Sequence, residues 1–162
     1  MSDQEWMERA IALAAKAASE NEIPVGAIVV LNDEIIGEGY NAPISLCDPT
    51  AHAEIQAIRN ACKMMNNYRL PGATLYVTLE PCSMCAGAMI HARIDRVVYA
   101  ATEPKSGVVE SQGQFFNAPF LNHKVNVESG ILAETASAQL TQFFQYRRER
   151  KKKLKEQAKK AT

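Results

Sequence analysis

The sequence predicts an α/β fold, a three-layer α/β/α arrangement with helices on both faces of a central, mixed five-stranded sheet. Three observations support it. Apolar residues at helical spacing alternate with short β-branched runs, Pro and Gly fall between these segments, and no linker is long enough to divide the chain. Strands that alternate with helices in this way are typical of layered α/β sheets. We therefore expect residues 1–162 to form one domain, a length that suits a single core.

The N-terminal part of the chain combines a helix with a β-hairpin. Apolar residues at helical spacing predict a first helix that ends before Pro24, namely Trp6, Ala10, Leu13, Ala14 and Ala17. Residues 25–31 are a continuous apolar run, rich in β-branched residues, as expected of a strand buried on both faces. A turn at residues 32–33 leads to a second strand at residues 34–40, and the proline-containing residues 41–49 form a loop.

Two helices are predicted in the middle of the chain. Thr50 is the expected N-cap of a helix that carries His52 and Glu54 in its first turn and continues to about Met64. Pro81 suits the first turn of another helix, which we expect to reach about residue 91.

Three further strands and a final helix complete the fold. The strands are predicted at residues 74–78 and 97–100 and, more weakly, at residues 125–127. Residues 103–123 have no clear period. The last helix is predicted from apolar residues at helical spacing, namely Leu132, Ala136, Leu140, Phe143 and Phe144. It runs into a basic tail, and helix and tail together span about residues 133–162.

Composition limits the class of protein. Apolar content of 47% and charged content of 22% are those of an ordinary globular protein. No apolar run approaches the length of a membrane span, and the first five residues are acidic rather than signal-like. We therefore expect a cytoplasmic protein without a membrane partner, whose four cysteines are reduced and available for metal.

The net charge of zero hides an asymmetry along the chain. From Arg147 onward there are nine Lys and Arg against two Glu, which leaves nine basic and sixteen acidic residues before that point. The tail therefore carries +7 and the body −7. A split of this kind indicates a polyanionic partner, although a solvated helix end is the alternative interpretation.

The site residues form two short motifs, Ala51-His52-Ala53-Glu54 and Pro81-Cys82-Ser83-Met84-Cys85. A catalytic zinc site takes three protein ligands and leaves a fourth position to water, and His52, Cys82 and Cys85 supply that number. Each motif falls at the start of a predicted helix, where ligands bind in layered α/β sheets. The combined H-x-E and P-C-x-x-C pattern is an established signature of zinc-dependent nucleobase deaminases.

Glu54 is the carboxylate that the metal does not need. Zinc lowers the pKa of its bound water towards neutrality and so produces a hydroxide. We expect Glu54 to take the proton of that water, deliver it to the ring nitrogen of a base, and later protonate the leaving ammonia. The alternative is a closed structural site with Cys47 as fourth ligand, but that site would not explain Glu54. We interpret Cys47 and Cys62 as free thiols and assign His91 and His123 to structure or surface.

The sequence resembles the bacterial tRNA-specific adenosine deaminases of the cytidine deaminase superfamily over nearly its whole length. The superfamily is marked by the Pro81–Cys85 motif. The tRNA branch is indicated by further blocks: Ile23–Ala27, Gly37–Asn41, Asp48–Glu54, Asn67–Arg69, Thr74–Arg93 and Phe143-Phe144.

This resemblance implies a cytidine deaminase-like fold and hydrolytic conversion of adenosine to inosine at the wobble position of a tRNA anticodon stem-loop. It also implies one Zn2+ per subunit and a homodimer. The substrate-binding positions that it suggests are Pro24 and Val25 in the wall of the base pocket, Asn41 on the target nucleotide, Ala53 in the His-Ala-Glu motif, and Glu103 and Lys105 in a loop beside that nucleotide. Glu103 stands where the family commonly has Asp.

The basic tail adds phosphate contacts to this picture. Arg148 and Arg150 belong to a dense basic run that follows Phe143-Phe144, and an anticodon loop offers phosphates to such a run. The helical register of Phe143 and Phe144 with Leu140 favours core positions for both rings, although an exposed ring could stack on a base.

Three other functions fit parts of the sequence. A deaminase of free nucleosides or nucleotides would share the zinc chemistry but needs no basic tail. A guanine or cytosine deaminase would also share the zinc chemistry, and only the family blocks argue against it. A zinc-stabilised RNA-binding module without activity would need neither Glu54 nor an open fourth position on the metal.

Overall fold

The computed structural model describes residues 1–161. Five strands form one sheet: β1 (Gly26–Leu31), β2 (Glu34–Tyr40), β3 (Thr74–Leu79), β4 (Arg96–Ala101) and β5 (Asn126–Ser129). Their order across the sheet is β2-β1-β3-β4-β5. β1 is antiparallel to both of its neighbours, whereas β3, β4 and β5 run parallel. The predicted mixed five-stranded sheet is therefore confirmed.

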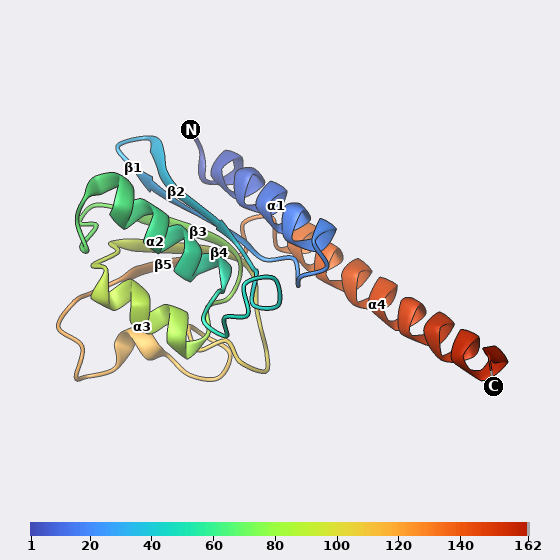
Figure 1. The fold of residues 1–162 in the computed structure, drawn as a ribbon. Helices are drawn as coiled ribbons and strands as arrows, with labels where there is room; N and C mark the ends of the chain where they lie inside the picture. The colour runs from blue at the N-terminus through green and yellow to red at the C-terminus, as the bar shows by residue number, and fades with distance from the viewer. Residues whose placement is uncertain (162) are drawn as a thin grey trace.

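Helices cover both faces of this sheet, as Figure 1 shows. α2 (Ala53–Met65) and α3 (Ser83–His91) lie on one face, and α1 (Asp3–Ser19) and α4 (Ala133–Ala161) lie on the other. A short 3-10 helix, η1 (Phe115–Asn117), interrupts the loop between β4 and β5. The three-layer arrangement predicted from the sequence is thus confirmed.

The core consists of two apolar clusters, one on each side of the sheet. Successive side chains of a strand point to opposite faces. Ile28 accordingly enters the cluster beneath α1, while Val29 enters the cluster beneath α2 and α3. The interior strand β1 is therefore covered on both faces and appears in the sequence as a continuous apolar run.

Close packing of α2 on β2 fixes the position of the first turn of that helix. Gly39 faces α2, and a Cβ added there would lie 2.4 Å from the backbone oxygen of Ala53. No larger residue fits between strand and helix without moving the helix. Since Ala53 lies between His52 and Glu54, this contact also positions both side chains.

A second anchor lies at the start of β4, away from the carboxyl ends of the strands. The Asp3 carboxylate accepts hydrogen bonds from Nη1 and Nη2 of Arg96, at 2.9 and 2.6 Å, and from the Tyr76 hydroxyl at 2.6 Å. The Arg96 guanidinium holds the pKa of Asp3 well below its usual range. These bonds tie the N-terminus of α1 to β3 and β4.

Two helices begin later than predicted. Thr50 is the predicted cap of α2, but its backbone N–H and hydroxyl both donate to the Asp48 carboxylate, and the N-cap residue is His52. Pro81 is predicted in the first turn of α3, but Cys82 is the N-cap and the helix begins at Ser83. In both cases the motif residue itself stands at the helix boundary.

α4 is the longest helix and extends beyond the body of the protein (Figure 1). Arg147 anchors it where it leaves: its Nη2 donates to the backbone oxygen of Asn21 at 2.9 Å, and its guanidinium lies 4.7 Å from the Phe143 ring centroid. Residues 148–161 are all exposed. Among the helices of residues 1–161, none is long and apolar enough to cross a membrane.

Candidate metal and catalytic site

The three predicted metal ligands meet where two helices begin. His52 and Cys82 are the N-cap residues of α2 and α3, both with extended backbone, and neither side chain caps its own helix. Cys85 follows in the first turn of α3 and is buried. Because Cys82 comes three residues after the end of β3, the cluster sits at the carboxyl end of a central strand.

The distances within this cluster fit a tetrahedral zinc ion. Zinc bonds of about 2.1 Å to nitrogen and 2.3 Å to sulfur, at a tetrahedral angle, place the two ligand atoms about 3.6 Å apart. Nδ1 of His52 lies 3.6 Å from Sγ of Cys82 and 3.6 Å from Sγ of Cys85. All three donor atoms lie within 4.8 Å of one another. This donor set suits zinc and leaves one coordination position open.

Electrostatics favour the metal-binding thiolate form at one of the two cysteines, Cys82. A hydrogen bond from Cys85, together with the one from His52, lowers the pKa of the Cys82 thiol to about 4. The same bond raises the pKa of Cys85, and the bond to Cys82 raises the pKa of His52. Cys82 is therefore a thiolate, the form that binds metal, and it stands at the positive end of a helix.

Glu54 lies beside the donor cluster and is not part of it. It occupies the first turn of α2 and is only 4% exposed. Burial raises the pKa of its carboxyl group to about 7. A carboxyl group with a pKa near neutral pH can both take up and release a proton, which is the property required of a general acid–base.

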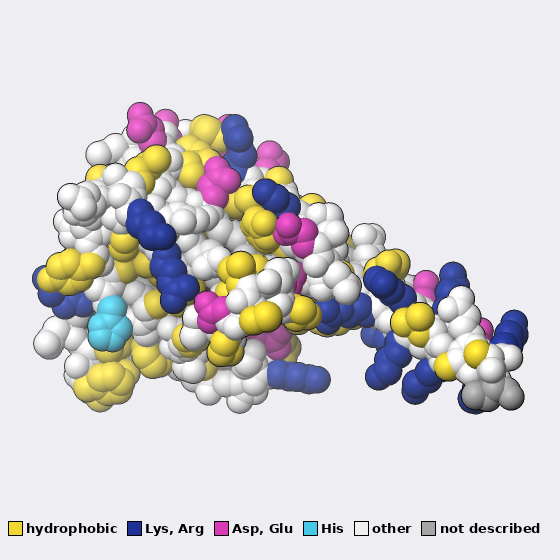
Figure 2. Space-filling view, in the orientation of Figure 1, with side chains coloured by type: hydrophobic (Ala, Val, Ile, Leu, Met, Phe, Trp, Pro, Cys, Tyr) yellow, Lys and Arg dark blue, Asp and Glu magenta, His cyan; other side chains and the backbone are white. Residues whose placement is uncertain are grey.

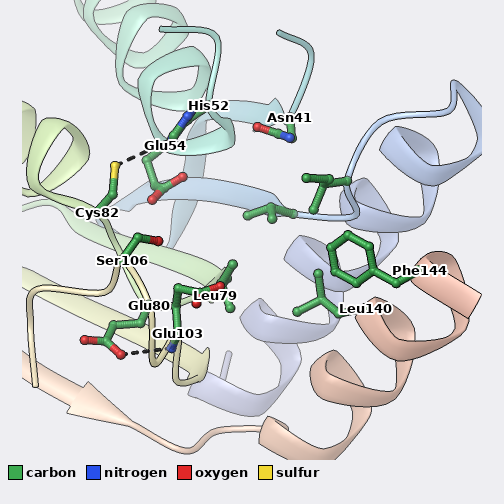
Figure 3. Close-up of a pocket in the computed structure, with 12 residues that line it drawn as sticks. Asn41, His52, Glu54, Leu79, Glu80, Cys82, Glu103, Ser106, Leu140 and Phe144 are labelled. Atoms are coloured by element: carbon green, nitrogen blue, oxygen red, sulfur yellow. Dashed lines mark hydrogen bonds between the residues drawn. The ribbon is translucent and has the colours of Figure 1, made fainter. Parts of the chain in front are cut away.

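A cavity of about 240 Å3 opens next to the cluster. Figure 3 shows Glu54 and Phe144 on opposite sides of it, with Asn41 and Glu103 from two different loops. Its walls come from the segment before β1, the loop after β2, the start of α2, the end of β3 with the residues that follow it, the loop after β4, and α4. The lining residues are Ile23, Val25, Asn41, His52, Glu54, Leu79, Glu80, Cys82, Glu103, Ser106, Leu140 and Phe144.

Some of the predicted substrate-binding residues meet in this cavity. Val25, Asn41 and Glu103 line it. Pro24 and Ala53 are buried and lie outside its lining. Lys105 is exposed in the loop after β4, while Arg148 and Arg150 are exposed on the projecting part of α4, so these three cations lie on the surface rather than in the cavity.

Phe144 does not occupy the core position predicted for it. Phe143 is 6% exposed, as expected, but Phe144 is 39% exposed and lines the cavity together with Leu140. Neighbouring residues on a helix point in different directions, so one ring enters the core while the other faces the site.

Sequence reasoning also missed Glu80 and Ser106 as lining residues. Ser106 appears in the sequence only as one residue of a polar loop. Glu80 had a possible signal, because an acidic residue stands directly before the Pro-Cys of the metal motif. Burial raises the pKa of Glu80, but hydrogen bonds from Glu110, Ser111 and Glu103 outweigh this effect and lower it.

The remaining cysteines and histidines stand apart from the cluster. Cys47 is an exposed free thiol, and its sulfur lies 3.8 Å from the Ile44 oxygen. Cys62 is also a free thiol. His91 is exposed, while Nε2 of His123 lies 2.7 Å from the backbone oxygen of Ile94. Within residues 1–161, the closed site with Cys47 as fourth ligand is not formed.

Comparison with known proteins identifies the family. Residues 1–101 match the family described as the cytidine and deoxycytidylate deaminase zinc-binding region. The chain is 53% identical to the tRNA-specific adenosine deaminase of Haemophilus influenzae, over 93% of this chain and 87% of that one. The chain belongs to the tRNA-specific adenosine deaminases. A relative with that name in Agrobacterium fabrum is 49% identical, over 88% of this chain and 94% of its own.

Solved structures of similar proteins agree with this membership of the deaminases. One, from work on A-to-I editing by tRNA:A34 deaminases at the wobble position of transfer RNA, has a TM-score of 0.82 and 46% identity, covering 84% of this chain and 99% of that one. A guanine deaminase from Bacillus subtilis has a TM-score of 0.61 and 35% identity, covering 76% and 89%. The zinc-binding family and the His-Cys-Cys donor set together make zinc the cofactor of this deaminase.

Replacing a proposed ligand should remove the metal. We expect Cys82→Ser to lose zinc and to unfold at a lower temperature, because metal binding at such a site is coupled to folding. Metal analysis of the purified protein measures the first effect and thermal unfolding the second. Cys47→Ser is the matched control and should retain zinc. Metal loss in Cys47→Ser would instead show that Cys47 is a fourth ligand and that the zinc site is a closed structural one.

Proposed function

We propose that the protein converts adenosine to inosine by hydrolysis at the wobble position of a tRNA anticodon. The observation that carries the proposal is the pairing of three converging zinc donors with a separate buried carboxyl group that lines the cavity beside them. The tRNA-specific relatives support adenosine in tRNA as the substrate. Zinc, when bound by His52, Cys82 and Cys85, supplies an activated water for the attack.

Glu54 carries the protons of the reaction. Water adds to C6 of adenine, and Glu54 takes a proton from that water and delivers it to N1 of the ring. Glu54 then takes the remaining proton from the new hydroxyl group on C6 and passes it to the amino group; the carbon–nitrogen bond breaks, ammonia leaves and C6 becomes the carbonyl carbon of inosine. Its position beside the donor atoms, and a pKa of about 7, support this shuttle role.

The cavity suits a nucleobase taken out of its stack. Single-stranded RNA loops are recognised through splayed bases that stack on aromatic rings and hydrogen-bond at their edges. Val25 and Phe144 offer apolar surface for the faces of the base, and the Asn41 amide, 8% exposed, offers both a donor and an acceptor. These residues would hold the target adenosine against Glu54.

Two rival functions are weaker. A guanine deaminase would use the same zinc chemistry, but this chain is less similar to the guanine deaminase structure than to the tRNA-specific relatives. A non-catalytic zinc module would not need a carboxyl group buried beside an open coordination position.

α4 is the element best placed to hold the phosphates of the RNA. Figure 2 shows Lys and Arg side chains concentrated along its projecting end. Arg147 serves as an anchor for the helix, so the phosphate contacts fall to exposed residues that follow it, including Arg148, Arg150, Lys151 and Lys152. Phe144 on the same helix lines the cavity, which connects the basic surface to the base-binding site.

We also propose that the protein acts as a homodimer in which α3 meets its copy. Apart from Ser83 and His91 at its ends, α3 consists of apolar residues and glycine, although only one side of it faces the core. A helix that is apolar all round is normally covered, and Met84, Gly87 and Ala88 are only partly buried. A monomeric mass in solution at micromolar concentration would contradict this assembly.

Neutralising the basic surface should weaken RNA binding without changing the chemistry. Replacing Arg148, Arg150, Lys151 and Lys152 by Ala should raise KM for tRNA and flatten the plot of log affinity against log salt by about 0.7 for each phosphate that the protein no longer neutralises. Zinc content should not change. Lys124→Ala, which removes a cation just before β5, is the control. An unchanged salt slope in the fourfold variant would make the tail a solvated helix end.

Removing the proton carrier should abolish turnover while leaving binding intact. We expect Glu54→Ala and Glu54→Gln to keep zinc and to bind an anticodon stem-loop as tightly as the unmodified protein, with deamination lower by at least about a hundredfold. Metal analysis, a binding titration and product mass measure the three quantities. Zinc loss in Glu54→Gln would show that Glu54 is a ligand, and residual turnover near the unmodified rate would remove it from the mechanism.

A further inference from the structure

Glu80 is a buried carboxylate that the proposed chemistry does not use. It follows the last residue of β3, precedes Pro81 and is only 3% exposed. Within residues 1–161, every hydrogen bond that it accepts comes from the loop after β4: from the backbone N–H groups of Glu103 at 3.0 Å, Val109 at 3.1 Å, Glu110 at 2.9 Å and Ser111 at 3.0 Å, and from the Ser111 hydroxyl at 2.5 Å.

Five donors leave this carboxylate no free acceptor site. A carboxylate offers about four lone-pair positions on its two oxygens, and both oxygens of Glu80 are fully used. None of the ion pairs formed within residues 1–161 includes Glu80. The charge is stabilised by loop amides and one loop hydroxyl, so the group is suited to hold the loop rather than to carry a proton.

The loop that Glu80 holds forms one wall of the cavity. Its donors lie at both ends of residues 103–111, and the cavity-lining Glu103 and Ser106 fall within that range. Glu103 also accepts the Lys105 N–H at 3.0 Å, which folds the start of the loop over itself. The loop therefore has little freedom between its two attachments to Glu80.

Two further contacts tie the loop to the segment that carries the metal motif. The N–H of Val108 donates to the backbone oxygen of Pro81 at 3.0 Å. Gly107 packs directly on Glu80, since a Cβ added there would lie 2.4 Å from the carboxyl carbon. The position of this loop relative to Cys82 is thus fixed by its contacts with residues 80 and 81.

We propose that Glu80 is a positioning residue for the target nucleotide: it fixes the loop of residues 103–111 so that Glu103 and Ser106 meet the nucleotide held beside Glu54. The inference rests on the proposed function for the identity of that nucleotide. The loop-holding role itself rests on the five hydrogen bonds and the contact with Gly107.

Glu80→Gln tests the role with almost no change in volume. The amide offers one oxygen where the carboxylate has two, and its NH2 group must face at least one loop donor. Turning the NH2 group away from the three amides of residues 109–111 places it against the Glu103 N–H. We therefore expect that amide to lose its acceptor first, and Glu103 to move out of the cavity wall.

The experiment compares hydrogen exchange with steady-state kinetics on an anticodon stem-loop. Glu80→Gln should exchange faster at Glu103, with unchanged protection in β3 and β4, and should show a KM about tenfold higher at wild-type zinc content. kcat should change by less than about threefold. Gly107→Ala places a methyl group against the Glu80 carboxyl group and so displaces the loop. It should also give faster exchange at Glu103 and a higher KM, with little change in kcat. It replaces Glu80→Gln as the test if that variant does not fold.

Asp3→Asn separates positioning from general stability. It removes a carboxylate with several hydrogen bonds at the far end of the strands, so it should lower the unfolding temperature while KM and loop exchange stay at wild-type values. Wild-type KM and wild-type exchange at Glu103 in both Glu80→Gln and Gly107→Ala would overturn the positioning role, as would an equal KM increase in Asp3→Asn.

A failure of the proposed function gives a different result. A zinc-loaded wild-type protein with no activity on the stem-loop would overturn the proposed function. Faster exchange at Glu103 in Glu80→Gln would still support the loop-holding role in that case, and unchanged exchange would overturn it.

Discussion

The structure depends most on the convergence of one imidazole nitrogen and two sulfur atoms at the start of two helices. Three such donors within 4.8 Å of one another fit a tetrahedral metal and leave a fourth position open. The helix dipole of α3 and the hydrogen bond from Cys85 hold Cys82 as the thiolate that a cation requires. The cavity, the buried Glu54 and the loop held by Glu80 are all arranged around that point.

The sheet explains how residues thirty positions apart reach the same place. α2 is held close to β2 by Gly39, which places His52 and Glu54, and β3 delivers Cys82 at its carboxyl end. The parallel pairing of β3 with β4 then brings the following loop to the same edge, where Glu80 captures it. Tertiary packing, rather than local helix preference, therefore sets the geometry of the site.

Much of this could be predicted from the sequence, because periodicity and motif spacing are local signals. The layers, the strands and the donor set follow from them. The predicted helix starts differ from the observed ones because Thr50 and Pro81 are residue types that favour a helix N-terminus locally. In the structure, His52 and Cys82 are the N-cap residues instead, and their side chains face each other. Periodicity favours the core for Phe144 and gives no role to Glu80, because the positions of both depend on contacts with distant segments.

The most direct test follows the oxygen atom. Zinc-loaded protein would be incubated in water labelled with oxygen-18, together with an anticodon stem-loop that has adenosine at the wobble position and elsewhere in the loop. Free adenosine, cytidine and guanine would be tested in the same way. We expect inosine at the wobble position only, with its new oxygen taken from the labelled water. Unchanged RNA together with deamination of a free base or nucleoside, or inosine without the label, would contradict it.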